Sequence, residues 1–554
     1  MFYRFQWVYC QLETLRHAIQ PGTIRLILKE LPESLDETYE RMLNEIIEIS
    51  PLNAYRLLQC LAVAVRPLRL EELAEILAFD FDEDLGRIPR LNADWRGENP
   101  KETVLSTLSS LITIVNNRGS QVVKFSHMSV KEFLTSDRLA CSQEFLSIFH
   151  IRPEPAHTIL AQACLGLLLR LGDRFDYEGG EYQYPLLGYA ARHWVTHAQF
   201  QDVISYLSVG LVHLFDLDKP HFAAWTRIYN IDADSGGKFP SEKASPLYYS
   251  ALCGFYDLAG HLILTYPEQI NAAGGSFGSP LVAAICRNHF PVAELLFQHG
   301  GNLEVRDARN QTALHKAIDR RHDVSTNAVS FLLKHGADVN AQRDDLWTPL
   351  HLAVNNDELL VARILLEFGA DVNSRNCDGH APLHLLSRRE TFQGEDDGSD
   401  IARLLLDYGA KVDDKDKDNA TPLHLASYNK KLKIVRALLD HGANTDAEKD
   451  RGETPLQLAL TRSGYHDAQD GIGVARLLLE HGAEAYGRDK YDISMSDLTR
   501  CFGNEKIGHV LLVDGEKIEP EDNRDQTAFW LWIEGEYYSS PGRSFGGLYI
   551  FPRV

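Results

Sequence analysis

Cysteines are few in this chain, and they are scattered. Eight occur among 554 residues, and no two of them form a C-x-x-C pair. That spacing excludes a disulfide scaffold and is typical of reduced thiols that pack as small apolar side chains. The first residues also lack the apolar segment of a secretory signal, and no apolar run approaches the ~20 residues that span a bilayer. We therefore expect a cytoplasmic protein that does not bind membranes.

Positive charge is scarce as well. Fifty-six lysines and arginines stand against 78 aspartates and glutamates, which gives a formal net charge of −22. Such a chain repels a phosphate backbone unless a local basic patch overrides the repulsion. The helix expected at Ser129–Arg138 lacks the run of Arg, Lys and Asn that phosphate and base contacts require. The sequence therefore argues against nucleic acid as a partner.

Enzyme motifs are missing or incomplete. A phosphate-binding loop needs G-x-x-x-x-G-K-[ST], but the only Gly-Lys pair, at Gly237, is followed by Phe239. Gly274–Gly278 matches G-x-S-x-G, the nucleophile elbow of esterases, yet no parallel sheet is expected around it. Ser276 is therefore predicted to be a loop residue. We expect a chain that is not an enzyme and needs no cofactor.

Asp414–Asp418 imitates the start of a calcium-binding loop. Such a loop requires Gly at its sixth position and a bidentate Glu at its twelfth, and this chain has Asn419 and Leu425 there. Without the closing carboxylate the segment is better interpreted as a solvated loop, in which Lys415 and Lys417 balance the acidic side chains. No metal site is predicted.

An internal repeat fills the second half of the chain. Seven segments open with one short pattern related to Thr-Pro-Leu-His, at intervals of 34, 33, 36, 33, 40 and 33 residues. Thr or Ser stands first in six of them, Leu third in all seven and His fourth in four. A glycine follows most of them in the same phase. Thr caps a first helix, Pro fits its first turn, and Gly takes the left-handed conformation that ends a second helix. The openings lie at Ser245, Ser279, Thr312, Thr348, Ala381, Thr421 and Thr454.

A unit of this length, with T-P-L-H opening one helix and L-L-x-x-G-A closing another, closely resembles the ankyrin repeat. The resemblance implies an α-solenoid of about eight repeats over residues 245–513, the last one degenerate. Extra residues after Ala381 and after Thr454 are expected to form loops on the same side. The histidines of the pattern are then structural groups that hydrogen-bond between neighbouring repeats, rather than metal ligands or bases. They are His315, His351, His384 and His424.

The amino-terminal half is predicted to be helical with one short strand. Ser34–Glu37 has the spacing of a capping box, and apolar residues then recur at helical intervals up to Pro51. Helices followed by a small hairpin suit a winged-helix module. The further elements expected are helices at 53–65, from Arg66 and at 104–115, a strand at 121–126 and a helix from Val130.

Four phrases of this half occur at Leu31–Arg41, Leu61–Glu75, Phe125–Leu134 and Ala156–Leu165. In this order they resemble the region after the NTPase core in fungal NACHT-type receptors, the fungal relatives of NOD-like receptors. The resemblance implies that His127 is a sensor histidine that reaches the phosphate of a bound nucleotide. A partly buried residue at a helix start is the alternative for His127. Because no NTPase core is present, a fragment, a shortened paralogue and a wrongly chosen start codon all stay open.

These patterns divide the chain into five expected parts. The fold class is mainly α, with an amino-terminal helical and winged-helix region followed by the ankyrin solenoid. For the aromatic tail, a hairpin on the last repeat, a partner-binding element and a gene-model error are the alternatives. The parts are a helical segment at 1–51, a winged-helix-like domain at 52–140, a helical linker at 141–244, the repeats at 245–513 and the tail at 514–554.

The resemblance implies an interaction protein, the sensor and regulatory part of a NACHT–ankyrin receptor that recognises a protein ligand. A NACHT core, in the same chain or another, is a second implied partner. The alternatives are a shortened adaptor that tethers a constant partner and a fragment of a nucleotide-hydrolysing switch. Residues that vary between repeats are the candidate partner surface, although each could vary only because it is exposed. They are Ala308, Asp344, Cys377, Lys417 and Asp450 at the tips of the inter-repeat fingers, and Arg321, Asn356, Arg389 and Asn429 near the ends of the first helices.

Overall fold

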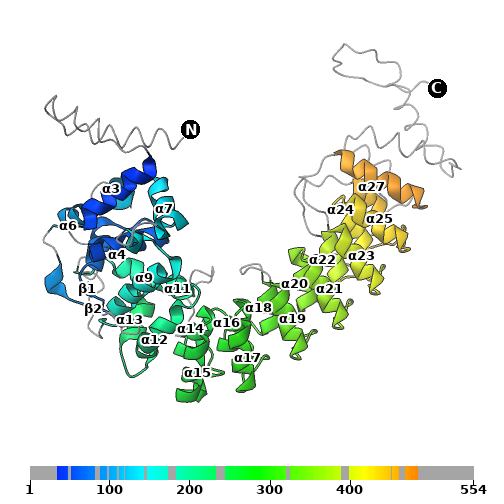
Figure 1. Ribbon diagram of the computed structural model, residues 1–554. Helices are drawn as coiled ribbons and strands as arrows, with labels where there is room; N and C mark the ends of the chain where they lie inside the picture. Colours follow the sequence, from blue (N-terminus) through cyan, green and yellow to red (C-terminus); the bar gives the residue numbers. More distant parts are fainter. Residues whose placement is uncertain are drawn as a thin grey trace, which may run out of the picture. The chain divides into compact units, whose positions relative to one another are not determined.

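The chain consists of two compact units, residues 1–305 and 306–554. Figure 1 shows the computed structural model. Within the part that the structure describes, every helix is too short or too polar to cross a bilayer. The described residues are 34–47, 51–81, 88–96, 99–108, 111–117, 119–141, 146–171, 183–232, 244–307, 309–319, 325–388, 398–450, 452–460 and 468–484.

Helices around a small hairpin open the amino-terminal unit. Strands β3 (Ile112–Asn117) and β4 (Ser120–Phe125) are antiparallel, with Ile112 opposite Phe125 and Asn117 opposite Ser120. A β-bridge between Arg69 and Val122 joins the start of a helix to this hairpin. The other elements of this region are α3 (Leu35–Ile47), α4 (Pro51–Val63), α5 (Leu70–Ile76), β1 (Phe79–Asp80), β2 (Arg90–Leu91), α6 (Pro100–Leu108) and α7 (Met128–Leu134).

The helix expected at 104–115 is wrong in its second half. Helix α6 ends at Leu108, and residues 112–115 belong to β3. The run Ile-Thr-Ile-Val is β-branched throughout, which favours a strand, and β4 supplies the partner for its backbone hydrogen bonds. The expected strand at 121–126 and the helix from Val130 are confirmed by β4 and α7.

A helical bundle separates the hairpin region from the repeats. Its central helix is α9, which is buried without interruption from Leu160 to Leu168. Trp194 and Trp225 are fully buried, with ring centroids 5.2 Å apart, and the Trp225 indole N–H donates to the Ala191 carbonyl at 3.0 Å. This aromatic core fixes the helices against one another. The helices are α8 (Asp137–Ala140), α9 (Pro153–Leu168), α11 (Leu187–Ala198), α12 (Ser208–Phe215) and α13 (His221–Ile228).

Each repeat is a pair of antiparallel helices. The amino-terminal unit holds two described pairs and the carboxyl-terminal unit five. The insertions at 389–397 and 461–467, the eighth repeat and the tail beyond 484 lie outside the described residues. The pairs are α14 (Pro246–Cys253) with α15 (Tyr256–Thr265), α16 (Pro280–Cys286) with α17 (Phe290–Gln298), α18 (Ala313–Ile318) with α19 (Thr326–Lys334), α20 (Pro349–Asn356) with α21 (Leu359–Glu367), α22 (Pro382–Arg388) with α23 (Ser399–Asp407), α24 (Pro422–Tyr428) with α25 (Leu432–Asp440), and α26 (Pro455–Leu460) with α27 (Ala468–Glu480).

In the carboxyl-terminal unit the helices form two layers, as Figure 1 shows. First helices α18, α20, α22, α24 and α26 pack on one another in order, and so do second helices α19, α21, α23, α25 and α27. The apolar face of each helix is buried between neighbours, so every repeat depends on the next for its core. The result is a row of similar units whose loops project in register.

Local signals set the helix ends as the sequence predicts. The Thr348 hydroxyl accepts from the backbone N–H of His351 at 3.4 Å, and Pro349 occupies the first turn of α20. After α21, Gly369 takes φ 88°, a left-handed conformation that a side chain would strain. The repeat length therefore follows from capping chemistry at both ends.

Candidate partner-binding surface of the repeats

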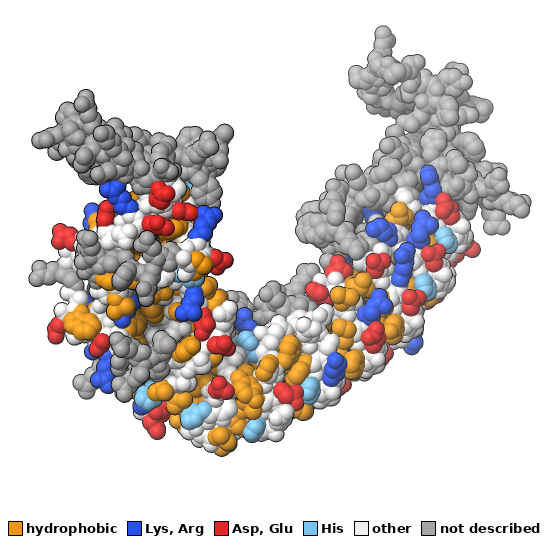
Figure 2. Space-filling model, viewed as in Figure 1, with side chains coloured by type: hydrophobic (Ala, Val, Ile, Leu, Met, Phe, Trp, Pro, Cys, Tyr) orange, Lys and Arg blue, Asp and Glu red, His pale blue; other side chains and the backbone are white. Residues whose placement is uncertain are grey.

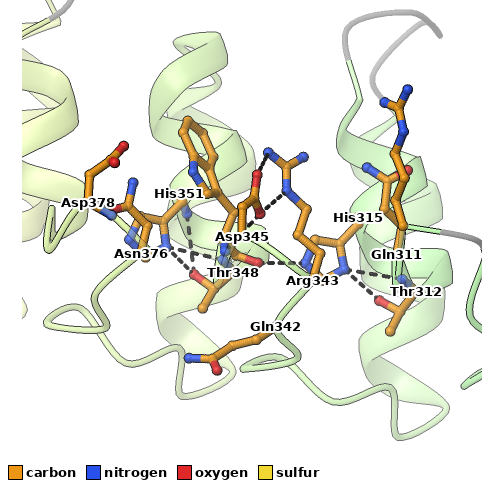
Figure 3. A network of polar contacts seen from close by, with 12 residues as sticks. Gln311, Thr312, His315, Gln342, Arg343, Asp345, Thr348, His351, Asn376 and Asp378 are labelled. Atoms are coloured by element: carbon orange, nitrogen blue, oxygen red, sulfur yellow. Dashed lines mark hydrogen bonds and ion pairs between the residues drawn. The ribbon is translucent and has the colours of Figure 1, made fainter.

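The pattern histidines form the frame of the repeats. His351 accepts the Thr348 backbone N–H at Nδ1, at 3.2 Å, and lies 2.7 Å from the Thr348 hydroxyl. Its Nε2 then carries the proton and donates to the His380 carbonyl of the next repeat, at 3.1 Å. One side chain thus joins its own helix cap to the following finger. Figure 3 shows His315 and His351 beside the threonines of their own caps.

The same bond recurs along the array. Burial lowers the pKa of His315, His351 and His424 to about 4 and also lowers that of His384, so these rings are neutral. The prediction that these histidines are structural groups between repeats is confirmed. The Nε2 atoms of His315, His384 and His424 lie 3.0, 3.0 and 3.1 Å from the carbonyls of Trp347, Asp414 and Glu453.

A finger is the loop that leads from one repeat to the T-P-L-H of the next, and each finger is closed by a backbone bond. In the finger 413–420, the Asp416 N–H donates to the Ala420 carbonyl at 3.0 Å. The Asp416 carboxylate accepts the N–H groups of Asp418 and Ala420, both at 2.9 Å. This carboxylate, the centre of the calcium-like motif, therefore stabilises a turn.

The predicted finger-tip residues lie at equivalent places. Asp344, Cys377, Lys417 and Asp450 are all exposed. The backbone of two of them is bonded to the preceding finger: the Cys377 N–H donates to the Asp345 carbonyl at 3.0 Å, and the Asp450 N–H to the Asp418 carbonyl at 3.1 Å. Side chains of different character therefore project from a fixed backbone.

Two residues of the predicted surface use their amides within the array. Asn356 is only 8% exposed, and its amide donates to the Ile318 carbonyl at 2.6 Å. Asn429, half-buried, donates to the carbonyls of Ser387 and Arg388, each at 3.2 Å. The position of Asn356 as exposed surface is corrected, because its amide is used to bond the preceding first helix. The place of Asn429 on the partner surface stays a prediction.

The remaining predicted surface residues, Ala308, Arg321 and Arg389, lie outside the described residues. Their place on the partner surface stays a prediction. The finger-tip residues at 344, 377, 417 and 450 are exposed, and their role in binding also stays a prediction.

Sequence reasoning missed Leu346, which lies in the finger 340–347. Leu346 takes φ 60° there and is 43% exposed. At the same place the other fingers have Asn310, Gly379, Asn419 and Gly452, residue types that tolerate the left-handed conformation. The signal was present in the aligned repeats, as a leucine where Asn or Gly is usual.

The side chains beside Leu346 are fixed in place. Arg343 forms two bonds to Asp345, at 2.6 and 2.8 Å, and its guanidinium lies 5.0 Å from the Trp347 ring centroid. Burial alone would raise the pKa of Asp345, but Arg343 and the Trp347 N–H together lower it. The Trp347 ring is half-buried and packs near His351. Figure 3 shows this cluster between two repeats.

Among the described residues, the outer face of these second helices carries charged side chains of both signs. Figure 2 shows basic and acidic side chains interspersed over α23, α25 and α27. At equivalent places these helices expose an arginine and, one turn later, a carboxylate. The arginines are Arg403, Arg436 and Arg476, and the acidic residues are Asp407, Asp440 and Glu480.

His127 lies at the start of α7. Its Nδ1 accepts the Ser129 backbone N–H at 3.2 Å and lies 2.6 Å from the Ser129 hydroxyl, which in turn lies 2.8 Å from the buried Tyr39 hydroxyl. The side chain therefore caps the helix and is half-buried. This matches the predicted helix-start position of His127.

Ser276 belongs to the loop between the first two repeats. Its N–H donates to the Asp232 carboxylate at 2.6 Å, and the Tyr248 hydroxyl donates to the other carboxylate oxygen at 2.8 Å. Gly274 and Gly278 pair across the loop. The expectation that Ser276 is a loop residue is confirmed, and the fully buried Asp232 stabilises the loop.

Comparison with known families agrees with this geometry. A family described as ankyrin repeats, in three copies, matches residues 247–343, 323–416 and 395–489. These repeats are ankyrin repeats. A second family, described as the winged helix domain of GPI inositol-deacylase, matches residues 39–146.

Relatives share parts of the chain. The azaphilone pigments biosynthesis cluster protein L of Monascus ruber is 30% identical over 301 residues, 50% of this chain and 62% of that protein. The mouse ankyrin repeat and SAM domain-containing protein 6 is 27% identical over 132 residues, 23% of this chain and 15% of that protein. The chain spans less than two thirds of the length of either relative.

Among solved structures, the ankyrin repeat domain of Bcl-3, a member of the IkappaB family, is 27% identical. The likeness covers 40% of this chain and 93% of that domain, with a TM-score of 0.34. The ankyrin assignment therefore stands on the family match and on the bonds of the repeats themselves.

Proposed function

We propose that the chain recognises a protein ligand through the tips of its ankyrin fingers, and that it is the sensing and regulatory part of a NACHT-type receptor. Ankyrin repeats are a fold for protein–protein interaction, so the repeats act as an interaction scaffold. The observation that carries the proposal is the contrast between a constant frame and a varied exposed surface.

The polar groups of the constant frame form their hydrogen bonds within the array. The pattern histidines, the finger closures and the amides of Asn356 and Asn429 all bond within the array. At the tips, Asp344, Cys377 and Lys417 share one backbone geometry but differ in charge and chemistry. A surface whose side chains vary on a fixed backbone is suited to selective recognition.

The amino-terminal half supports the receptor part of the proposal. It matches a winged helix domain over residues 39–146, and its four phrases resemble the region that follows a NACHT core. If such a core is supplied by the same chain or by another, His127 is the residue that we expect to sense its nucleotide. The chain itself is proposed to act without catalysis.

We place this function in the cytoplasm. Cys60, Cys164 and Cys253 are buried free thiols. Burial raises the pKa of Cys60 and Cys253 to about 12, so neither thiol ionises at neutral pH. Unpaired thiols of this kind suit a reducing compartment.

A photo-reactive amino acid placed in the full chain tests the binding surface. It replaces Lys417 at a finger tip or, as the control, Lys433, which is exposed on the outer helix α25. Irradiation in the native cytoplasm should join one protein to the Lys417 variant and not to the Lys433 variant. Cross-links to the same protein only from Lys433 would contradict the proposal.

Titration with ATP or GTP tests whether this chain alone has a nucleotide site. The purified chain should not bind ATP or GTP in calorimetry, because it has no phosphate-binding loop in its sequence. Binding to the chain alone would show that a nucleotide site exists and would refute the non-enzymatic assignment.

A further inference from the structure

Leu346 is in an unfavourable conformation for its side chain. At φ 60° the Cβ atom lies too close to a backbone carbonyl oxygen, and such residues persist only where their surroundings hold them. Burial does not explain it, because 43% of Leu346 is exposed. An apolar side chain that is both strained and substantially exposed is a candidate for contact with another molecule.

The finger that carries Leu346 is braced on both sides. The Asp344 N–H donates to the Arg309 carbonyl at 3.4 Å, and the Asp345 carbonyl accepts the Cys377 N–H at 3.0 Å. The Trp347 carbonyl accepts from both His315 and the Arg343 N–H. Leu346 and Trp347 therefore project from a fixed loop, which lowers the entropy lost when another molecule packs on them.

Acidic side chains surround this pair along the finger tips. Asp344 is next to it, and Asp378 and Asp418 are exposed on the two following fingers. The exposed cations of the two following fingers are Arg375, Lys415 and Lys417, and each donates to a backbone carbonyl of a neighbouring finger, at Lys415, Glu448 and Cys377. Arg309 is a further exposed cation, on the preceding finger. The acidic side chains at the tips attract basic groups and repel acidic ones.

We propose that Leu346 and Trp347 form the anchor of the partner surface, which binds a basic protein segment by one large apolar side chain. The apolar side chain packs on the Leu346–Trp347 pair, and flanking Lys or Arg side chains face Asp344, Asp378 and Asp418. The inference rests on the proposed function and names the partner chemistry. A few buried anchor residues, among which Trp is enriched, carry most of the affinity of such interfaces.

Leu346→Asn is the decisive variant, because it separates stability from binding. Asn accepts the left-handed conformation, so the thermal midpoint of the full chain should stay or rise. Affinity for a basic, apolar segment should fall at least about tenfold. The matched control is Leu360→Asn on the outer helix α21, which removes a 64% exposed leucine away from the fingers.

A phage-displayed library of random short peptides, panned on the full chain and on both variants, is the probe. The inference expects wild type and Leu360→Asn to enrich the same basic sequences with a central Leu, Phe or Trp, and Leu346→Asn not to. Enrichment of acidic peptides, retention of the peptides by Leu346→Asn, or no enrichment at all would overturn it. A lower thermal midpoint for Leu346→Asn would also overturn it, by showing a structural role.

These outcomes leave the proposed function separately testable. If the finger-tip cross-link from Lys417 forms while the peptide result fails, the fingers bind a protein by another chemistry. If both fail, the proposed function fails with the inference.

Discussion

At the scale of the residue, a histidine in four of the seven described repeats performs two tasks that the sequence assigns to it only by resemblance. His351 holds its own helix cap and the next finger at once. Capping explains why Thr precedes it by three residues, and the carbonyl bond explains why the ring is buried. The T-P-L-H pattern therefore records a contact between repeats as well as a helix start.

Loss of this ring should be costly. His351→Ala leaves the His380 carbonyl and the Thr348 N–H without partners in a buried site, and we expect it to lower the free energy of unfolding by about 2–4 kcal/mol. Urea denaturation followed by circular dichroism measures the change. The control is His299→Ala, an exposed ring with one local bond, for which we expect a loss below about 0.5 kcal/mol. Equal losses for both would contradict the account.

The amide of Asn356 should behave as a structural group. Asn356→Ala removes its bond to the Ile318 carbonyl, so the free energy of unfolding should fall by about 1–2 kcal/mol. Asn355→Ala, an exposed neighbour, is the control and should change little. A binding defect with full stability would restore Asn356 to the partner surface.

The sequence alone could not place Asn356 or Leu346. Both lie at positions that vary among repeats, and variability does not distinguish an exposed side chain from one that bonds a neighbouring carbonyl. The tips at Asp344 and Lys417 were predictable, since the repeat period fixes their position in the turn. The repeat period does not predict whether a given side chain is buried by a neighbouring repeat.

At the scale of the element, caps decide where helices begin. His127 caps α7 with its ring, and a smaller acceptor could do the same. His127→Ala should raise the exchange rate of the first amides of α7 and cost about 1 kcal/mol, whereas His127→Asn should restore most of both. Amide hydrogen exchange followed by mass spectrometry measures the difference. Indistinguishable Ala and Asn variants would contradict the capping role.

Strand β3, which the sequence analysis expected as part of a helix, shows the limit of hydrophobic periodicity as a signal for single elements. Residues 112–115 are apolar or β-branched in a short run, and such a run fits a buried strand as well as a helix. Its pairing with β4 decides the outcome. The sequence predicted the return strand because the turn before it contains Gly119, whereas nothing comparable marked the start of β3.

At the scale of the whole molecule, stability should depend on pH through the frame histidines. In the fold, the pKa of His315, His351 and His424 is about 4, below the unfolded value of about 6.5. The unfolded chain therefore binds more protons between these values, and the stability is full above pH 6.5 and falls as the pH drops toward 4. Each histidine contributes a slope of up to about 1.4 kcal/mol per pH unit in this window.

Chemical denaturation of the full chain at pH 7, 6, 5 and 4 measures this slope. His351→Gln keeps a hydrogen-bonding side chain but cannot titrate, so its slope should be smaller than that of wild type by about one proton. A stability that is flat or rises on acidification would contradict neutral, buried frame histidines.

The central claim is that the finger tips bind a protein while the second helices do not. Amide hydrogen exchange of the full chain, with and without the protein captured by the Lys417 cross-link, tests it most directly. The account predicts protection in the fingers 340–347, 373–380 and 413–420 and unchanged exchange in α21, α23 and α25. Protection confined to those outer helices would contradict it.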